Sequence, residues 1–430
     1  MDRAIFSEIQ DFIIRSKVHS ILLVKGARQV GKTYAVEAVL DRVDLPSTRI
    51  NLERDITTRD RIDRSVDFDD FTFLLKSSFG FQEDEPQIVF IDEAQESSKL
   101  GSYVRFMKED WKNKKVILTG SSTSRLFKKG QRVPVGRFAS IKIGPFTFEE
   151  YLRFFDKGAL LEAISICERK PPSELIHQNF LEEYDRYLEI GGMPQVLEAV
   201  KNGENYNNIR TALILSQRED FISKTQIEDA QLFDECLIAV ANHVGSPSKY
   251  SDVSGSYHYT KKTMSVMANW LLVLEVHRQG SDPNKGDFLP KRYVYDIGVL
   301  RHYQNRPFQN VSILDASQPE LRTYLGGVFE NAVLIDLEGR YFKQGPITTW
   351  KAGRTSSNEV DFVIARDDCY IPIECKASLR VTNRTFVNVK RYLEHSKQEI
   401  GYVISAAPFQ RFDTKSFKLI NFPVYMSSVI

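Results

Sequence analysis

The chain has 430 residues and a formal net charge of +1 at pH 7, with 42% hydrophobic and 27% charged residues. This composition is typical of soluble globular proteins and supplies enough apolar residues for a sizeable core. The length predicts about two to four domains. Because the net charge is close to zero, the whole molecule is not a polycation, and any nucleic-acid surface must be a local patch.

The cysteines and the apolar runs bear on the cellular compartment. The four cysteines include no C-x-x-C pair, which argues against a zinc ribbon or a disulfide framework and fits a reducing cytosol. The first twelve residues carry charged side chains among the apolar ones, unlike a signal peptide. No apolar run approaches the length of a membrane span. We therefore expect a cytoplasmic protein with no membrane segment.

The first motif in the chain fills every fixed position of the pattern G-x-x-x-x-G-K-[ST]. An apolar strand at 21–24 precedes the motif and a helix-compatible stretch at 32–40 follows it, so bound phosphates would lie at a helix N-terminus. Backbone N–H groups of such a turn surround phosphate oxygens, while Lys32 reaches the β and γ phosphates and Thr33 offers a hydroxyl to Mg²⁺. The pattern predicts an ATP site, and the alternative is a chance glycine-rich turn. The motif residues are Gly26, Ala27, Arg28, Gln29, Val30, Gly31, Lys32 and Thr33.

A second motif follows the apolar run at 87–91, which is typical of a central strand in a parallel sheet. The run ends in Asp92 and Glu93, at the strand end where α/β sheets bind ligands. We predict that Asp92 holds Mg²⁺ and that Glu93 polarises the water that attacks the γ phosphate. The alternative is a pair of solvated carboxylates. Two further strands of the same sheet are expected at 48–52 and 116–118, with a helix at 96–112 before the second.

Polar and basic residues follow the last of these strands. Thr119 and Ser121 are candidates to bond the γ phosphate or the attacking water, although turn and cap roles fit them equally well. The cap role is the better interpretation for Ser122. In the basic stretch that comes next, Arg137 is the candidate arginine for the transferring phosphate, with Arg132 as the second choice. A solvated surface loop is the alternative for both arginines.

Taken together, these motifs resemble those of a prokaryotic family of AAA+-type ATPases. The segments 144–152 and 187–194 resemble that family's link into its helical region and a later signature. The resemblance implies a P-loop ATPase core over 1–145 and a helical, lid-like region over 146–225. Members of the family also carry a C-terminal domain of uncharacterised function that resembles restriction-endonuclease folds.

The region 226–300 predicts a winged helix-turn-helix. Its third helix would enter a major groove if it bound DNA, and Lys261 and Lys262 at its start suit phosphate contacts. The same helix carries the apolar run 270–273, so much of it belongs to the core, and winged helices also bind proteins. Whether the module contacts DNA or protein stays open. The expected elements are helices at 231–243, 250–255 and 260–274 and strands at 274–277 and 293–295.

A second chemical constellation lies in a predicted hairpin with strands at 359–365 and 370–376. Counting outward from the turn places Asp361 and Glu374 nearly opposite each other. Like charges in that arrangement destabilise a sheet unless a divalent metal ion lies between them. Lys376 is two residues beyond Glu374 and therefore on the same face of the strand.

Two carboxylates and a lysine in this arrangement resemble the working set of PD-(D/E)XK nucleases, so 301–430 is expected to be a nuclease-like domain. The resemblance implies that the acids hold Mg²⁺, that the metal activates water, and that the lysine positions or deprotonates that water. It also implies a further ligand, Glu330, on a helix at 327–337. The match departs in two respects: no proline precedes Asp361, and Pro372 lies inside the second strand. A surface hairpin and a metal-binding fold without cleavage are the alternatives.

The sequence therefore predicts an α/β protein with a P-loop parallel-sheet core of the AAA+ type, a helical lid, a winged helix and a restriction-endonuclease-like domain. The first hypothesis is a Mg²⁺-dependent ATPase coupled to a nuclease-like domain that acts on DNA. Arg137 would complete the ATP site in the same subunit or from a neighbour in a homo-oligomer. The second hypothesis is a nucleotide-dependent switch or scaffold whose C-terminal domain binds DNA or protein without cleavage. A small-molecule kinase fits less well, because Glu93 beside Asp92 suits water activation. No protein partner is indicated.

Overall fold

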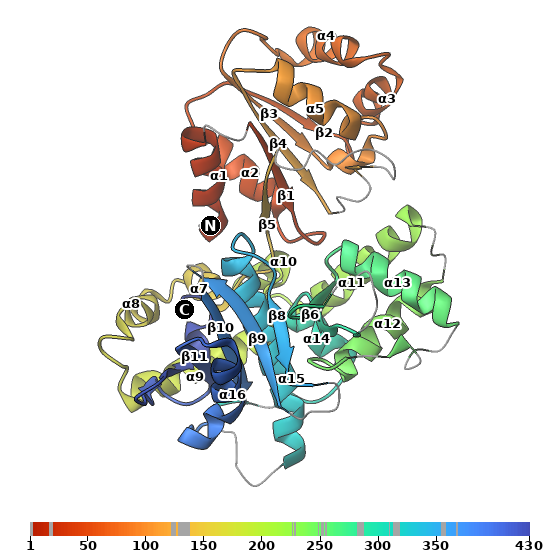
Figure 1. Cartoon of the computed structure of the whole chain (residues 1–430). Coiled ribbons are helices and arrows are strands. Elements are labelled where there is room, and N and C mark those ends of the chain that lie inside the picture. The colour runs from red at the N-terminus through yellow and green to blue at the C-terminus, as the bar shows by residue number, and fades with distance from the viewer. Residues whose placement is uncertain are drawn as a thin grey trace. The chain divides into compact units, whose positions relative to one another are not determined.

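The computed structural model divides the chain into two compact units, one formed by Met1–Ile143 with Asn269–Leu271 and the other by Gly144–Ala268 with Leu272–Ile430 (Figure 1). Within the described residues, no helix combines the length and apolarity needed to cross a membrane. The expected divisions after 225 and 300 stay predictions. The structure describes residues 3–16, 20–121, 126–127, 138–225, 227, 229–247, 249–250, 253, 256–281, 288–308, 310–312, 319–353, 358–366 and 369–430.

The first unit contains a five-stranded sheet with the strand order β2-β3-β4-β1-β5, and every pair of neighbours is parallel. All six residues of β3 are buried, as expected for a central strand of a parallel sheet. The expected P-loop sheet is thereby present in the structure. Its strands are β1 (Ile21–Lys25), β2 (Ser47–Asn51), β3 (Gln87–Asp92), β4 (Lys114–Gly120) and β5 (Ala139–Lys142).

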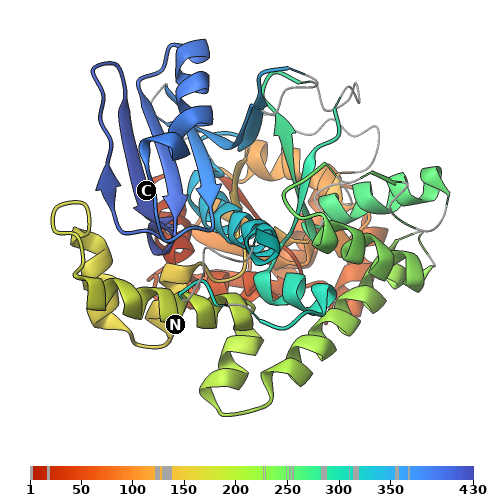
Figure 2. The same cartoon turned by 90° about the horizontal axis from the view of Figure 1, so that it is seen from below.

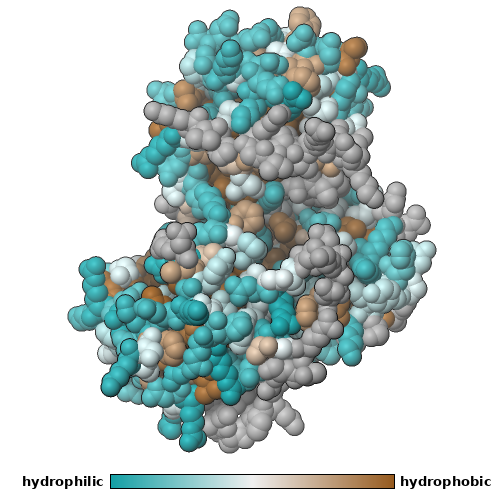
Figure 3. Space-filling model, in the orientation of Figure 1, coloured by the Kyte–Doolittle hydropathy of each residue, from teal (hydrophilic) through white to brown (hydrophobic). Residues whose placement is uncertain are grey.

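Helices flank this sheet, with α1 and α2 on one side and α4 and α5 on the other (Figure 1). On the second side, a core of aromatic rings packs against the sheet, and the rings of Phe71 and Tyr103 are stacked with centroids 5.2 Å apart. On the face shown in Figure 3, the surface of this unit is mostly hydrophilic, with hydrophobic residues scattered singly. The helices are α1 (Ala4–Arg15), α2 (Lys32–Leu40), α3 (Ile56–Arg64), α4 (Phe68–Phe79), η1 (Ala94–Glu96) and α5 (Leu100–Asp110).

The helix α5 begins later than the expected start at 96. The hydroxyl oxygen of Ser97 accepts hydrogen bonds from the backbone N–H groups of Lys99 (3.3 Å) and Leu100 (3.1 Å). A serine that bonds nearby backbone donors in this way favours a helix cap over a helix interior. The acidic and polar residues after Glu93 therefore form a short 3₁₀ turn and a cap, and the α-helix begins only at Leu100.

The second unit is built around an eight-stranded mixed sheet with the order β12-β13-β11-β10-β9-β8-β6-β7. The hairpin β9–β10 lies near the middle of this sheet, and β10 pairs with β11 in parallel. Both α15 and α16 lie against β9 and β10 (Figure 2). The strands are β6 (Val273–Arg278), β7 (Lys291–Val294), β8 (Thr348–Lys351), β9 (Glu359–Arg366), β10 (Cys369–Lys376), β11 (Ile400–Ser405), β12 (Gln410–Arg411) and β13 (Lys418–Pro423).

Helices account for most of the remaining chain in this unit. The region expected to be helical and lid-like, residues 146–225, contains five helices, which is consistent with its sequence pattern. The helices are α7 (Phe148–Phe154), α8 (Gly158–Ile166), α9 (Glu174–Ile190), α10 (Pro194–Lys201), α11 (Tyr206–Lys224), α12 (Ala230–Asn242), α13 (Tyr257–Asn269), α14 (Ile297–Gln304), α15 (Pro319–Tyr341), η3 (Asn383–Phe386), α16 (Val387–Ser396) and η4 (Val424–Met426).

The hairpin expected as the wing is formed by β6 and β7, but it belongs to the large sheet. Strand β6 pairs in parallel with β8 at His277↔Thr348 and Arg278↔Thr349. The helix expected at 260–274 ends at Asn269, because Leu271 takes a left-handed φ of 59° and the chain turns into β6. Most of the short helix expected at 250–255 lies outside the described residues. The winged-helix and restriction-endonuclease-like folds both stay predictions.

Candidate functional site

The phosphate-loop motif connects β1 to α2, as its sequence context predicts. Gly31 caps α2 with a left-handed φ of 91°, a conformation that glycine adopts without steric cost. A Cβ atom added at Gly26 would lie 2.4 Å from the carbonyl oxygen of Ile143, so the chain passes too close there for any larger residue. These two positions explain why the motif requires glycine, and they place Lys32 and Thr33 in the first turn of the helix.

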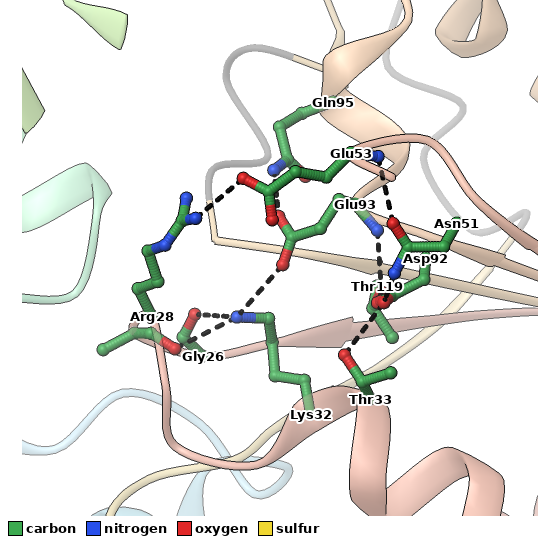
Figure 4. A network of polar contacts seen from close by, with 11 residues as sticks. Gly26, Arg28, Lys32, Thr33, Asn51, Glu53, Asp92, Glu93, Gln95 and Thr119 are labelled. Carbon is green, nitrogen blue, oxygen red and sulfur yellow. Dashed lines mark hydrogen bonds and ion pairs between the residues drawn. The ribbon is translucent and has the colours of Figure 1, made fainter. Parts of the chain in front are cut away.

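Lys32 is buried and points across the loop toward Glu93 (Figure 4). Its Nζ donates hydrogen bonds to the carbonyl oxygens of Gly26 (3.3 Å) and Ala27 (3.0 Å) and lies 3.9 Å from Oε1 of Glu93. Burial lowers the pKa of Lys32, and the nearby carboxylates of Glu93 and Asp92 oppose that shift. The ammonium is therefore held beside the loop's own carbonyl groups and within reach of an acid.

The carboxylate of Asp92 gathers three donors at the end of β3. Its Oδ2 accepts hydrogen bonds from the hydroxyl of Thr33 (2.9 Å) and the amide of Asn51 (2.7 Å), and its Oδ1 accepts one from the hydroxyl of Thr119. Burial raises the pKa of Asp92, while the Thr119 hydrogen bond opposes the rise. A hydroxyl and a carboxylate in direct contact are oxygen ligands of the kind that Mg²⁺ prefers, so these residues fit the metal.

Glu93 is held by its backbone and its side chain. The residue takes a left-handed φ of 52°, and its N–H donates to the hydroxyl oxygen of Thr119 (3.1 Å). The side-chain amide of Gln95 donates to Oε2 of Glu93. A non-glycine residue in this conformation costs free energy, and such strain is found at functional sites. The hydrogen bonds with Thr119 and Gln95 thus orient the Glu93 carboxylate toward Lys32 (Figure 4).

Three residues of this network were not singled out in the sequence. Asn51 bonds Asp92, Gln95 bonds Glu93, and Glu53 accepts a hydrogen bond from Arg28 (2.7 Å) within the motif loop. Asn51 pairs with Asp92 across neighbouring parallel strands, so the rule that ligands bind at the carboxyl ends of such strands points to it as well. The signal for Gln95 is weaker, because only the turn after β3 brings it back toward Glu93.

The structure describes only some of the remaining candidate residues of the first unit. Thr119 is fully buried between Asp92 and the backbone of Glu93, and Ser121 is also buried. Ser122, Arg132 and Arg137 lie outside the described residues. The arginine contribution to this site therefore stays a prediction.

The candidate residues of the C-terminal hairpin come together in the second unit. The β9–β10 register ends at Phe362↔Ile373, and the next pair in that register is Asp361 opposite Glu374, as counted from the sequence. The backbone N–H of Cys375 donates to Oδ2 of Asp361 (2.8 Å). A pocket of about 640 Å³ opens at this end of the hairpin. Its lining includes Gly245, Arg306, Gly327, Glu330, Asp361 and Lys376.

A lysine that the sequence did not single out lies at the centre of these acids. Nζ of Lys291, at the start of β7, is 2.7 Å from Oε1 of Glu359, 3.2 Å from Oδ1 of Asp361 and 3.3 Å from Oε1 of Glu330. The hydroxyl of Tyr293, two residues further along β7, donates to the same Glu330 oxygen (2.5 Å). The alternation of side chains along a strand explains why Lys291 and Tyr293 reach one carboxylate together.

Burial and like charges perturb the acids of this pocket. Burial, followed by repulsion from Asp361, raises the pKa of Glu330 to about 7 and that of Glu374 to about 8. Burial alone would lower the pKa of Lys291, but attraction to Glu330, Asp361 and other neighbours holds it well above its usual value. Nζ of Lys376 lies 2.6 Å from Oε1 of Glu374, on the same strand.

The acids do not form a metal site in their present arrangement. In the part of the chain that the structure describes, no group of three or more His, Cys, Asp or Glu side chains is placed to hold a metal ion. Lys291 already lies between Glu330 and Asp361. The side chains therefore do not fit the Mg²⁺ that the nuclease resemblance implies, whereas those around Asp92 do.

Comparison with known families bears on the first unit. Residues 18–152 match a family model described as an AAA domain. This part of the chain therefore resembles an AAA domain, and it contains the P-loop. Two further models, both described as domains of unknown function, DUF8612 and DUF4143, match residues 181–310 and 325–425. The match supports the expected AAA-type P-loop domain, and the matches further along the chain leave the nuclease-like interpretation a prediction.

Individual relatives are distant. An uncharacterised protein of Haemophilus influenzae is 23% identical over 269 residues, a match that covers 60% of this chain and 57% of that protein. Among solved structures, a Walker-type ATPase of Pyrococcus abyssi is similar with 15% identity and a TM-score of 0.45, covering 70% of this chain and 95% of the other. A chain from a structure of Drosophila ORC bound to DNA reaches 13% identity and a TM-score of 0.25, covering 66% and 89%. Both TM-scores are low, and the assignment of the AAA domain does not depend on them.

Proposed function

We propose that the chain binds ATP with Mg²⁺ at the loop between β1 and α2 and hydrolyses it with Glu93 as the residue that activates water. The observation that carries this proposal is the convergence of Lys32, Thr33, Asp92 and Glu93 in one network, with Thr33 2.9 Å from Asp92 and Lys32 3.9 Å from Glu93. Lys32 is then close enough to exchange its contacts with loop carbonyls for phosphate oxygens, which are the stronger partners for an ammonium.

Each residue of the network has a separate task in this proposal. Mg²⁺, when bound with ATP, would neutralise charge on the β and γ phosphates. Thr33 and Asp92 supply oxygen ligands, and Thr119 fixes the orientation of Asp92 and Glu93 through its two hydrogen bonds. Glu93 accepts a proton from the attacking water, a role that needs a positioned carboxylate. Arg137 is the candidate to stabilise charge on the transferring phosphate, within one subunit or between neighbours in an oligomer.

Steady-state ATP hydrolysis by the full chain tests this assignment. The Lys32→Ala variant should lose about 100-fold or more in rate, because a fixed positive charge next to the reacting phosphate is removed. Lys112→Ala, which changes an exposed lysine of the same unit, is the matched control and should hydrolyse ATP at the wild-type rate. Equal rates for wild type and Lys32→Ala would contradict the proposal.

We further propose that the pocket of the second unit interacts with DNA under the control of the ATP site. Arg306 and Lys376 line this pocket beside Glu330 and Asp361, so cationic side chains are available for a phosphate backbone. The C-terminal stretch adds to this charge, since residues 376–430 contain nine Lys or Arg and three Asp or Glu. The more specific form of this proposal is that the pocket cleaves DNA with a metal-activated water.

A second candidate function is binding of DNA or protein without cleavage. The position of Lys291 among Glu330, Glu359 and Asp361 favours it, because an ammonium supplies charge to these acids but cannot activate a water molecule as a metal does.

One experiment separates the two forms. Wild type and Asp361→Ala are incubated with ATP, Mg²⁺ or Mn²⁺, and single-stranded, double-stranded and forked DNA, while binding is measured in parallel. Cleavage that is lost in Asp361→Ala supports the nuclease form. DNA binding without cleavage, weakened in Arg306→Ala, supports the binding form, and the absence of any DNA binding would overturn the role of DNA in both.

A further inference from the structure

The side chain of Lys291 is buried with only 5% of its surface exposed, yet it carries a charge. A buried ammonium is costly unless it is closely paired and hydrogen-bonded. Here its Nζ lies within 3.3 Å of Glu330, Glu359 and Asp361, so one cation faces three carboxylates from one strand and one helix. This is the coordination environment in which proteins usually place a divalent cation rather than a lysine.

Several of the oxygens that a metal would need are engaged by protein donors, although Oε2 of Glu374 is buried without a hydrogen-bond partner among the described residues. Oδ1 of Asp361 contacts Lys291 and its Oδ2 accepts the backbone N–H of Cys375. Oε1 of Glu330 accepts from both Lys291 and Tyr293. Oε1 of Glu374 is paired with Lys376. A divalent ion placed among these groups would lie next to an ammonium, and the repulsion between the two cations in a buried site would be large.

The backbone also closes over this cluster. Gly245 has a φ of +76°, and a Cβ atom added there would lie 2.9 Å from Oε2 of Glu330. A residue larger than glycine at position 245 would therefore crowd this oxygen of Glu330. Residue Lys291 is itself fixed by strand pairing with Val276 and by a bridge to Pro247. These backbone pairings hold Lys291 between the acids, in the place that a Mg²⁺ ion would occupy.

We propose that Lys291 is the resident counter-ion of Glu330, Glu359 and Asp361, in the place that a metal ion would take, and that this pocket works without a divalent metal. The inference rests on the proposed function only in treating the pocket as the working site of the second unit. It does not depend on the ATP site or on DNA. The pocket then recognises its ligand through fixed charges such as Arg306 and Lys376.

The test counts Mn²⁺ bound per chain, by electron paramagnetic resonance, on the full chain without nucleotide. The variants are Lys291→Met, Asp361→Asn and the double variant, with Lys351→Met as the matched control. Lys351 contacts Glu359 at 3.6 Å but is 34% exposed and lies at the edge of the cluster. Every variant keeps the same ATP site, so any Mn²⁺ held there contributes equally to all counts.

The proposal predicts that wild type, Asp361→Asn and Lys351→Met bind the same number of Mn²⁺ ions. Lys291→Met should bind one more, and the double variant should lose that extra ion. Mn²⁺ should also raise the melting temperature of Lys291→Met by more than that of wild type. A wild-type Mn²⁺ ion that disappears in Asp361→Asn would overturn the proposal, as would a folded Lys291→Met that gains none. If Lys291→Met does not fold, the comparison of wild type with Asp361→Asn still decides. Loss of ATP hydrolysis or of DNA binding would leave these counts unchanged. Failure of the proposed function is therefore distinguishable from failure of this inference.

Discussion

The hydroxyl of Thr119 donates a hydrogen bond to the carboxylate of Asp92 and accepts one from the backbone N–H of Glu93. One buried side chain thereby fixes both acids that the proposed hydrolysis uses. Thr119 lies at the end of β4, next to β3 in the parallel sheet, so the sheet itself sets the distance between them. A β-branched residue with a restricted χ1 suits this position.

Replacing Thr119 by Val keeps the shape but removes the hydroxyl, which leaves two buried polar groups without their partner. We expect a loss of about 1–3 kcal/mol in stability. Because this hydrogen bond opposes the rise in the pKa of Asp92, the pKa should rise further in Thr119→Val, and the acid limb of the ATPase pH profile should move to higher pH. Thr119→Ser keeps the hydroxyl and should retain the wild-type profile. An unchanged acid limb in a folded Thr119→Val would show that Thr119 does not act through Asp92.

Gln95 is expected to act as a positioning residue for Glu93. In Gln95→Ala the Glu93 carboxylate loses its amide donor, so kcat should fall about tenfold, which is the usual worth of a hydrogen bond to a charged group. The affinity for ATP should not change, because the hydrogen bond of Gln95 is to Glu93, which acts on the attacking water. Steady-state kinetics separates the two quantities. A rise in KM with kcat unchanged would assign Gln95 to binding instead.

The absence of a side chain at Gly120 leaves room for the side chain of Gln95. A Cβ atom added at Gly120 would lie 2.3 Å from Oε1 of Gln95, so Gly120→Ala must displace that side chain. We expect Gly120→Ala to lower kcat as much as Gln95→Ala does, and the double variant to be no worse than either one. Gly158→Ala is the control, since a Cβ atom there would meet nothing within 4 Å. Additive losses in the double variant would mean that Gly120 acts independently of Gln95.

The raised pKa of Glu374 predicts a dependence of stability on pH. Its pKa moves from a usual 4.5 to about 8 through burial and the proximity of Asp361. An acid whose pKa is raised on folding stabilises the native state below its unfolded pKa, and this contribution is lost as pH rises through the folded pKa. The free energy of unfolding in urea should therefore fall between about pH 5 and pH 8, by an amount on the order of 4 kcal/mol from this group.

Glu374→Gln should flatten that slope, because the amide does not titrate. Glu394→Gln, an exposed acid on α16, should leave it unchanged. Parallel curves for wild type and Glu374→Gln between these pH values would contradict the assignment.

The sequence revealed the parts of the molecule that depend on local pattern. The loop from Gly26 to Thr33 and the apolar run before Asp92 are contiguous motifs, and the structure places the run in the expected sheet and the loop directly after β1. The hairpin register, which ends at Phe362↔Ile373, agrees with the count along the chain that places Asp361 opposite Glu374 as the next pair. In each case the relevant residues are close in sequence or sit at the ends of neighbouring strands.

What the sequence did not reveal depends on contacts between distant segments. In the sequence, Lys291 is an ordinary charged residue at the start of a strand. Only the packing of β7 beside α15 and β9 brings it to Glu330 and Asp361. The end of α13 at Asn269 was missed because a left-handed leucine at 271 has no sequence signature. Ser97 was taken as helix interior although its hydroxyl caps the helix.

The central claim is that Glu93 activates water while Lys32 holds ATP, and a single-turnover measurement of the Glu93→Gln variant tests it most directly. ATP and Mg²⁺ are mixed with an excess of protein. The fraction of ATP that is bound and the rate of phosphate release are both followed. The account predicts ATP binding close to that of wild type and a hydrolysis rate lower by about 100-fold or more, because a glutamine cannot accept the proton. Hydrolysis by Glu93→Gln at the wild-type rate would contradict it.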